Sequence, residues 1–310
     1  MKIDRNKAAE LDFSPLDPSA FSGEEMARPE TTYFKDVWRN FRKRKTAMVS
    51  LVVLGLLVFM VLFGPYMRPF DYFTNDYNAS NLAPDAEHWF GTDVLGRDLW
   101  TRVWMGGRVS LLIAILATII PYAIGMAIGG VSGYFGGKVD MLIMRTIDVL
   151  MGIPSLIYDI LLIMVLGSGN ISTLVIAFSI TGWMGSARTT RGLVLQMRNR
   201  EFIMASETLG ASPMRVIFRH LLPNTLGIII VGMTMTIPSI IFSEAFLSFI
   251  GLGITPPNPS WGQLIKEASE VFKKYPYQFI IPCIFVSLTM LCFNLLGDGL
   301  RDALDPKLRS

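Results

Sequence analysis

Two uncharged runs of this chain are each long enough to cross a membrane. Residues 47–67 and 110–131 hold 21 and 22 residues without a charged side chain. As an α-helix, each run covers about 30 Å, the thickness of the hydrocarbon core of a bilayer. Hydrophobic residues make up 51% of the chain and gather in such runs instead of spreading along amphipathic elements. The sequence therefore predicts an all-α membrane protein that crosses the bilayer several times.

The hydrophobic runs predict six transmembrane helices. The expected spans are 47–67, 108–131, 142–167, 171–189, 224–252 and 278–298. Prolines at positions 121, 154, 238 and 282 lie inside these spans and are expected to kink or break them. In the second span, glycines at positions 125, 129, 133 and 137 recur every fourth residue. That spacing predicts close packing of this span against a neighbouring helix.

The distribution of lysine and arginine predicts the orientation. With six spans, both termini lie on the same side. If that side is the cytoplasm, the inner segments carry 21 of these residues and the outer segments carry 7. We therefore expect two cytoplasmic termini, residues 1–30 and 299–310 being tails. Residues 31–46 are expected to form an amphipathic helix at the membrane surface, and residues 68–107 an extracytoplasmic loop.

Motifs of enzymes and metal sites are not found. The segment closest to a phosphate-binding loop is "SGYFGGKVD", in which Ser132 replaces the first glycine and Val139 follows the lysine. Cys283 and Cys292 are nine residues apart in one apolar run, and the chain has only two histidines. These spacings do not suit a metal site. We expect no catalytic residue, no metal and no cofactor in this chain, and no binding of nucleic acid.

Several ionisable residues fall inside the expected spans, where an unpaired charge costs about 3 kcal/mol or more. Arg145 and Asp148 are three residues apart and are expected to form a local ion pair. Asp159 and Glu244 have no partner at helical spacing. Each either faces a water-filled path or pairs with a neighbouring helix or subunit. A secondary transporter driven by ions or protons is one function that would need these two acids.

The stretch "ASETLGASPMRVIFRHLLPN" (205–224) predicts two short helices separated by a turn. Gly210 is expected to end the first helix, and Ser212 to cap a second one that has Pro213 in its first turn. Pro223 is expected to close this second helix. Small residues and flanking arginines indicate a surface onto which a soluble partner docks. An ordinary cytoplasmic loop is the alternative.

The same stretch resembles the coupling loop of ABC importer permeases, whose pattern is E-A-A-x3-G-x9-I-x-L-P. Aligned on Gly210, the chain departs from the pattern at Met204, Ser206 and His220. Three other stretches resemble the C-type transmembrane subunit of oligopeptide and dipeptide importers: "HWFGTDVLGRDLWTRVWMGGRVSLLIA" (88–114), "EAFLSFIGLGITPPNPSWG" (244–262) and "GDGLRDALDPKLR" (297–309). The resemblance covers almost all of the chain after about residue 33.

This resemblance implies a type I importer fold with a core permease domain at 108–298 and a coupling loop at 199–222. It implies a bacterial inner-membrane complex with a homologous second permease subunit, two ATP-binding subunits that hold ATP and Mg, and an extracytoplasmic peptide-binding protein. The coupling residues would be Ala205, Ser206, Glu207, Gly210, Ala211, Arg215 and Pro223. A nickel importer of the same branch, a secondary transporter and a membrane scaffold without transport activity remain alternatives.

Two further sites are hypotheses about the transport path and its outer end. Glu244 is the first choice for a path residue, because a buried acid can meet the ammonium end of a peptide; Asp159 is the second. Asp93, Asp98 and Trp261 are expected to belong to a rim that docks the binding protein. The alternative is that this loop is only a lid over the outer helix ends.

Overall fold

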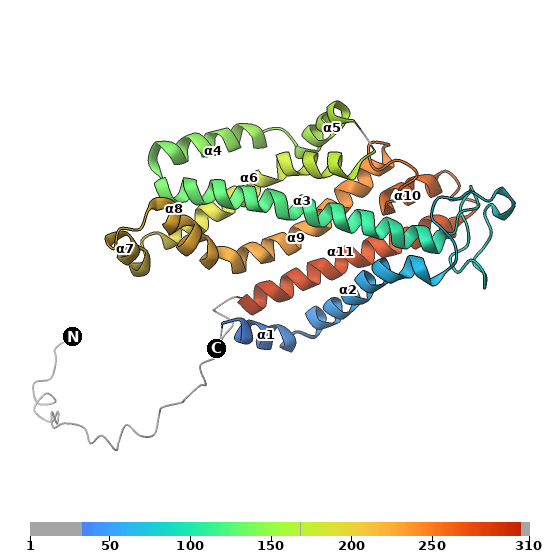
Figure 1. The fold of residues 1–310 in the computed structure, drawn as a ribbon, viewed down its shortest axis with the longest axis horizontal. Coiled ribbons are helices and arrows are strands. Elements are labelled where there is room, and N and C mark those ends of the chain that lie inside the picture. Colours follow the sequence, from blue (N-terminus) through green and yellow to red (C-terminus); the bar gives the residue numbers. More distant parts are fainter. Residues whose placement is uncertain (1–32, 168, 305–310) are drawn as a thin grey trace, which may run out of the picture.

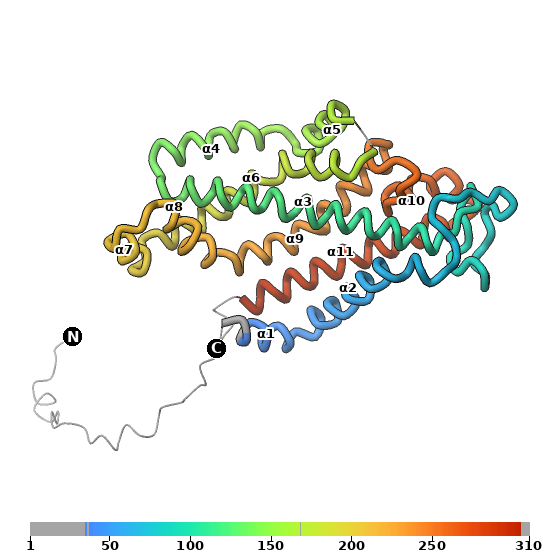
Figure 2. Tube along the Cα trace, in the orientation of Figure 1, coloured from blue at the N-terminus to red at the C-terminus, as the bar shows by residue number. Residues whose placement is uncertain are grey.

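The computed structural model describes residues 33–167 and 169–304. Within them, the regular elements are helices, and pairing of extended backbone is limited to two isolated bridges. Most of the long helices run along the long axis of the molecule (Figures 1 and 2). The expected tail at 1–30 and the last six residues of the expected tail at 299–310 lie outside the described residues.

The helices follow one another along the chain as a series of long elements joined by short ones. They are α1 (Tyr33–Lys43), α2 (Lys45–Phe63), η2 (Gly64–Met67), η3 (Tyr77–Ala79), α3 (Leu99–Phe135), α4 (Gly137–Met151), α5 (Ser155–Leu166), α6 (Ile171–Met197), α7 (Glu201–Thr208), α8 (Pro213–Arg215), η4 (Val216–Leu221), α9 (Leu222–Phe249), α10 (Trp261–Ser269) and α11 (Pro276–Leu304). The element η4 is a π-helix that joins α8 to α9 without a break. We call the two ends of the bundle the α7 end and the α10 end (Figure 1).

Four helical segments of the described residues are long and apolar enough to cross a membrane. They are Lys45–Met67, Leu99–Phe135, Pro213–Phe249 and Pro276–Leu304. A fifth crossing is added if α4 and α5 together form one span. The helix α6 is 27 residues long but is more polar, with serine, threonine, glycine and arginine along it. The expected count of six spans is therefore not confirmed, although a multi-span helical membrane protein is.

The expected span at 142–167 is broken at the position of Pro154, where a kink or break is predicted. The helices α4 and α5 meet there at an angle of 82° across residues 152–154. Proline disfavours helical backbone in the residue before it, and it lacks the N–H needed inside a helix, so the break falls directly before α5. By contrast, Pro121, Pro238 and Pro282 lie inside helices that continue past them.

The glycines of α3 bring its backbone against α6, as their spacing predicts. A Cβ atom on Gly125 would lie 1.9 Å from the Ser186 hydroxyl oxygen, and one on Gly129 would lie 2.3 Å from the Ala187 carbonyl oxygen. Gly133 packs against Val194 and the Arg191 carbonyl. Only glycine permits such an approach, because any side chain would push the two helices apart. Gly137 is outside this contact and begins α4 with a φ of +53°.

A second layer is formed by α1, α2 and α11, which lie together below α9 in Figure 1. Gly299 of α11 packs against Ala47 of α2, and Phe41 of α1 is buried between them. An exposed ion pair joins Arg44 to Asp302 at 3.1 Å. The amphipathic pattern expected at 31–46 thus forms α1 and the start of α2, with one apolar face against the bundle.

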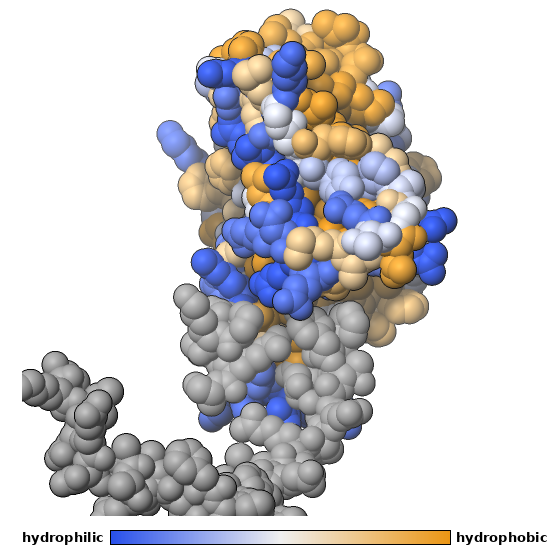
Figure 3. All heavy atoms as spheres, turned by 90° about the vertical axis from the view of Figure 1, so that its left-hand side faces the viewer, coloured by the Kyte–Doolittle hydropathy of each residue, from blue (hydrophilic) through white to orange (hydrophobic). Residues whose placement is uncertain are grey.

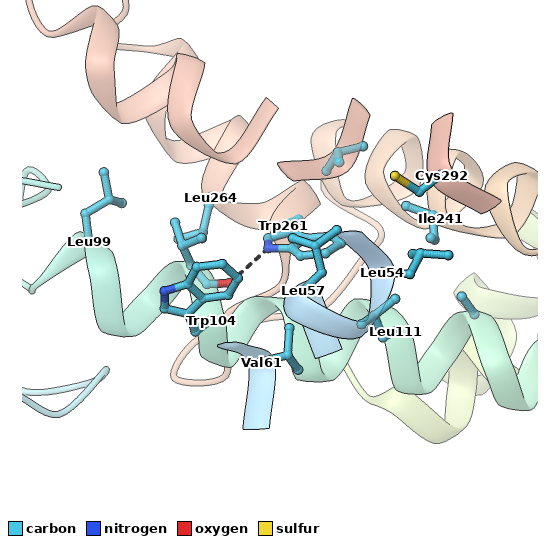
Figure 4. Packing of buried hydrophobic residues seen from close by; sticks show 13 residues of the cluster. Leu54, Leu57, Val61, Leu99, Trp104, Leu111, Ile241, Trp261, Leu264 and Cys292 are labelled. Atoms are coloured by element: carbon cyan, nitrogen blue, oxygen red, sulfur yellow. Dashed lines mark hydrogen bonds between the residues drawn. The ribbon is translucent and has the colours of Figure 1, made fainter. Parts of the chain in front are cut away.

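The largest buried cluster lies toward the α10 end, where α2, α3, α9, α10 and α11 meet (Figure 4). Its centre is Trp261, which is fully buried and donates from its indole nitrogen to the Val103 carbonyl oxygen at 2.9 Å. Trp104 stacks edge-on against Phe285 in the same cluster. A buried tryptophan with its N–H paired fixes α10 firmly on α3. This anchoring positions the charged and polar groups at the α10 end.

Candidate functional sites at the two ends of the bundle

The turn after α7 has the geometry that its sequence predicts. Gly210 has a φ of +83°, in the left-handed region that favours glycine. Its amide donates to the Glu207 carbonyl at 2.9 Å, and the Ala211 amide donates to the Ser206 carbonyl at 3.1 Å. These two bonds form a Schellman motif, which ends α7 sharply and satisfies its last carbonyls. The prediction that Gly210 stops this helix is confirmed.

The second helix of the pair differs from its prediction. Pro213 does stand in its first turn, but the Ser212 side chain makes no capping hydrogen bond. The helix does not close at Pro223 and instead continues as η4 and α9 to Phe249. Because Pro223 has no N–H to donate, the helix widens into a π-helix immediately before it, and the Asn224 side chain donates to the His220 carbonyl at 2.6 Å.

The α7 end presents apolar side chains to the outside. Leu209 is 89% exposed, and four further large apolar residues are between 45% and 54% exposed: Phe202, Met204, Met214 and Phe218. In the view of this end, hydrophobic and hydrophilic side chains are intermixed on the surface (Figure 3). Of the predicted coupling residues, Ala205, Glu207, Gly210, Arg215 and Pro223 are exposed, and Ser206 and Ala211 are half-buried. An exposed apolar turn of this kind is suited to contact another protein.

Few contacts attach α7 to the rest of the chain. Ile203 is its one buried residue and packs in a cluster with Val216 and Ile217 of η4. The Tyr134 hydroxyl at the end of α3 donates to the Glu207 carboxylate at 2.7 Å. Within the described residues, the packing of Ile203 and the bond from Tyr134 attach α7 to the bundle, while η4 continues directly into α9. Sequence reasoning did not find Tyr134, which lies 73 residues before Glu207.

At the α10 end, four charged side chains form a neutral cluster. Arg97 donates to the Asp93 carboxylate at 2.7 Å and to the Glu267 carboxylate at 3.0 Å. Arg102 contacts the same Asp93 oxygen and donates to Glu267 at 2.9 Å. All but Glu267 are buried. The cluster ties the loop before α3 to α10 and borders a cavity of about 340 Å³ between that loop, α10 and residues 251–256.

Asp98 begins α3 as its N-cap. Its carboxylate accepts bonds from the Thr101 amide and hydroxyl, both at 2.8 Å, and lies 2.9 Å from the His88 ring nitrogen. In the same loop, Asp85 accepts a hydrogen bond from the His88 amide, which lowers the pKa of that carboxyl below its usual range. These bonds give an ordered loop, in agreement with the glycine and aspartate content of the segment.

The three residues expected to dock a binding protein are all buried inside this chain. Asp93, Asp98 and Trp261 are 6%, 2% and 0% exposed. Their observed contacts are internal: two organise the loop before α3, and the third anchors α10. These side chains therefore form no exposed rim, and a role in docking stays a prediction for the surrounding loop. The expected loop at 68–107 is also shorter, because α3 begins at Leu99.

Glu244 is 1% exposed and is enclosed by serine side chains. Its carboxylate accepts bonds from the Ser110 hydroxyl at 2.9 Å and the Ser248 hydroxyl at 2.8 Å. The Ser110 oxygen in turn accepts from the Trp261 amide at 3.1 Å. The acid thus joins α9, α3 and the start of α10. Of the two interpretations of this acid, contact with neighbouring helices describes the observed geometry, and contact with a peptide stays a prediction.

Asp159 also bonds to a neighbouring helix. It is 4% exposed and accepts a hydrogen bond from the Thr181 hydroxyl of α6 at 3.0 Å. The expected local pair of Arg145 and Asp148 is wrong, because Asp148 pairs with Arg188 of α6. Among the described residues, Arg145 forms no ion pair. Within the same part of the chain, no group of three or more metal-ligating side chains could hold an ion.

The bundle of apolar helices defines a polytopic membrane protein. The chain belongs to the family of binding-protein-dependent transport system inner membrane components, which matches residues 125–310. Residues 32–84 match the N-terminal transmembrane domain of oligopeptide transport permease C. The family consists of membrane transport subunits and not of enzymes. Membership in it therefore argues against the two alternatives of a secondary transporter and a scaffold without transport activity.

Curated relatives match over almost the whole chain. The dipeptide transport system permease protein DppC of Bacillus subtilis is 47% identical, over 92% of this chain and 89% of the relative. The oligopeptide transport system permease protein OppC of the same organism is 43% identical, over 96% and 97%. The glutathione transport system permease protein GsiD of an Escherichia coli strain is 40% identical, over 94% and 97%.

One solved structure shares the fold. It shows inward-facing conformations of the MetNI methionine ABC transporter and aligns with a TM-score of 0.54. The alignment covers 66% of this chain and 97% of the transporter chain, at 17% sequence identity. At this identity, the likeness concerns the fold alone.

Proposed function

We propose that this chain is a permease subunit of an ATP-driven importer of peptides. The single observation that carries this proposal is the near-complete match to dipeptide and oligopeptide permease subunits at 43–47% identity. A third relative is named for glutathione, which is itself a small peptide. The nickel alternative is not favoured by any of these relatives.

The importer has the type I permease fold with six spans. In this arrangement, α4 and α5 together form one span and α6 forms another, which adds two crossings to the four longer helices. Both termini face the cytoplasm of a bacterium, in agreement with the excess of lysine and arginine in the segments on that side. The α7 end is then cytoplasmic, and the α10 end faces outward.

The exposed turn at the α7 end docks on an ATP-binding subunit. Two such subunits hold ATP and Mg, and this chain pairs with a homologous permease subunit to enclose the path. A peptide-binding protein delivers the substrate to the α10 end. The exposed Leu209 and its apolar neighbours support the docking, as does the direct continuation of the turn into α9. Burying such a patch against a partner removes apolar surface from water.

Gly210 offers a sharp test of the docking. Gly210→Ala adds a methyl group that meets no atom within 4 Å, so its only effect is strain at a φ of +83°, about 1–2 kcal/mol. The matched control is Gly55→Ala, in which the added methyl group also meets no atom but the backbone is helical. Both variants are purified with an affinity tag from their native membrane, and the proteins that accompany them are quantified.

The expected result is a pair of ATP-binding subunits with wild type and Gly55→Ala, and a reduced yield of them with Gly210→Ala. Undiminished recovery with Gly210→Ala and with the stronger Gly210→Pro would contradict docking through this turn. The transport proposal has its own readout, which is ATP-dependent uptake of labelled di- and tripeptides by vesicles that contain the complete complex. Uptake of nickel without uptake of any peptide would overturn it.

A further inference from the structure

The backbone is broken and exposed where α4 meets α5. Residues 151–155 are all exposed, and three of them, Gly152, Ile153 and Pro154, lie between the two helices. The Gly152 and Ile153 amides still donate to the Val149 and Leu150 carbonyls, and Pro154 has no N–H, so the groups left without helical partners are carbonyls of the break and the first amides of α5. In contact with lipid, each unsatisfied group costs several kcal/mol, so non-helical backbone at membrane depth is found only inside protein or beside water.

Contacts with α6 show how deep this break lies. Before the break, Asp148 pairs with Arg188, and after it, Asp159 accepts a bond from Thr181. The break therefore lies beside the segment of α6 between residues 181 and 188. That segment packs on α3 between Pro121 and Gly129, which is inside the uncharged run at 110–131. The exposed break is thus at the depth of the hydrocarbon core.

Charged groups extend the same exposed face toward the α7 end. The side chains of Asp148 and Arg188 are 49% and 42% exposed although they pair with each other. Arg145 is exposed one turn earlier on α4 and forms no ion pair among the described residues. Gly185 on α6 leaves open space, since a Cβ atom there would meet nothing within 4 Å. A lipid-facing surface at this depth would exclude such charges.

We propose that this face, defined by Arg145, Asp148, Arg188 and the break at Gly152–Pro154, lines the water-filled path of the importer. The proposal rests on the proposed function and specifies its path. Water supplies hydrogen bonds to the carbonyls of the break and the first amides of α5, and the charges remain hydrated. Glu244 and Asp159 are not part of this face, because both are buried against neighbouring helices, and their contact with a peptide stays a separate prediction.

The charge of this face indicates which part of a peptide it meets. Arg145 and Arg188 together with Asp148 give a formal charge of +1, and Arg188 is already paired. Arg145 is left to attract an anion. A peptide with free ends carries a carboxylate at one end, and a guanidinium binds a carboxylate through two parallel hydrogen bonds. Arg145 is therefore a binding residue for the carboxyl terminus of the peptide in transit.

Cysteine accessibility tests whether water reaches the face. In a chain with Cys283 and Cys292 replaced that still assembles, Ile153→Cys and Leu56→Cys are compared within the complete complex in membranes. Both positions are more than 40% exposed in the isolated chain, and Leu56 lies in the middle of α2. A small charged thiol reagent is expected to modify Ile153→Cys at least about tenfold faster, because only the thiolate in water reacts readily.

Equal, slow modification at both positions would overturn the proposal, since lipid or a second subunit would then cover the break. Slowing of the reaction at Ile153→Cys by transported peptide supports it, whereas no effect of peptide contradicts a path. This labelling does not depend on transport. If wild type failed to take up any peptide, the proposed function would fail while the accessibility of the face was still measured.

The role of Arg145 is tested with paired substrates. Uptake of one tripeptide with a free carboxyl terminus is compared with uptake of the same tripeptide as its amide, in wild type, Arg145→Gln and Arg145→Lys. Arg145→Gln is expected to raise KM about fivefold for the peptide with a free carboxyl terminus and to leave KM for the amide unchanged. A factor of about five corresponds to the loss of one solvated ion pair. Arg145→Lys is expected to reverse part of this increase in KM. Equal loss for both peptides, or loss for neither, would refute carboxylate recognition.

Discussion

Removing Arg102 tests whether the charge cluster at the α10 end stabilises the fold as a balanced unit. Asp93, Glu267, Arg97 and Arg102 sum to zero charge, and Arg102 is fully buried. In Arg102→Met, two carboxylates compete for Arg97, which leaves one uncompensated charge. Breaking a buried pair in this way costs about 3–5 kcal/mol. We expect the lower end, because the Glu267 side chain is 31% exposed and remains partly hydrated.

A second variant restores the balance without restoring the arginine. In Arg102→Met with Glu267→Gln, Asp93 keeps its 2.7 Å bond to Arg97 and no net charge is left. Arg102 also has two buried nitrogens without a hydrogen-bond partner, Nε and Nη2, so its replacement removes two unsatisfied polar atoms. We therefore expect the double variant to recover most of the lost stability, since a balanced buried pair is replaced by apolar and neutral groups.

The assay is thermal unfolding of the purified complex in detergent, followed by loss of the monodisperse peak. For a chain of 310 residues, a loss of about 3 kcal/mol corresponds to a fall of about 5 °C in Tm. Arg44→Gln is the control, because it breaks an ion pair whose side chains are 51% and 40% exposed and should cost under about 1 kcal/mol. A single variant that melts like this control, or a double variant that melts no higher than the single one, would refute the reasoning.

Three further predictions concern single contacts. Gly125→Ala should destabilise the complex by about 1–3 kcal/mol, because its methyl group would lie 1.9 Å from the Ser186 oxygen. The control Gly185→Ala should not, because its methyl group enters open space. Equal Tm values for the two variants would contradict the close packing of α3 on α6. Glu244→Gln should keep hydrogen bonds to Ser110 and Ser248, whereas Glu244→Leu removes the acceptor of both hydroxyl protons and should cost about 2 kcal/mol or more, measured by thermal unfolding. If Glu244→Gln lowers uptake of peptides with free but not blocked amino termini, the acid does contact substrate. Tyr134→Phe should raise the rate of amide hydrogen exchange in α7 but not in α9, because the substitution removes only the bond to Glu207. Unchanged exchange in α7 would show that the apolar packing of Ile203 holds this helix without the bond.

Features with a local cause were predictable from the sequence. The uncharged run at 110–131 lies within the single helix α3, because its length and composition alone determine that it spans a bilayer. Gly210 ends α7 because the left-handed backbone of that turn excludes most other residues. The glycines of α3 pack against α6 because their spacing of four places them on one face.

Features that depend on distant partners were not predictable in this way. Asp148 has an arginine three residues away, but it pairs with Arg188, which lies 40 residues later and is brought near by the packing of α3 on α6. Glu244 gains hydroxyl partners from two helices, one of them 134 residues away. Pro223 carries a strong local signal for the end of a helix, but a π-helix absorbs its missing N–H and the helix continues.

The uninterrupted helical segment from Pro213 to Phe249 has a consequence for the size of any movement that it carries. Its 37 residues extend over about 55 Å at about 1.5 Å per residue. If this segment rotated as a rigid rod by about 10° about the Gly210 turn, its far end would move sideways by about 10 Å, given a length of about 55 Å. A shift of a few ångströms at the α7 end is thereby amplified where α9 meets α10. The segment works as a lever whose short arm is at the α7 end and whose long arm reaches α10.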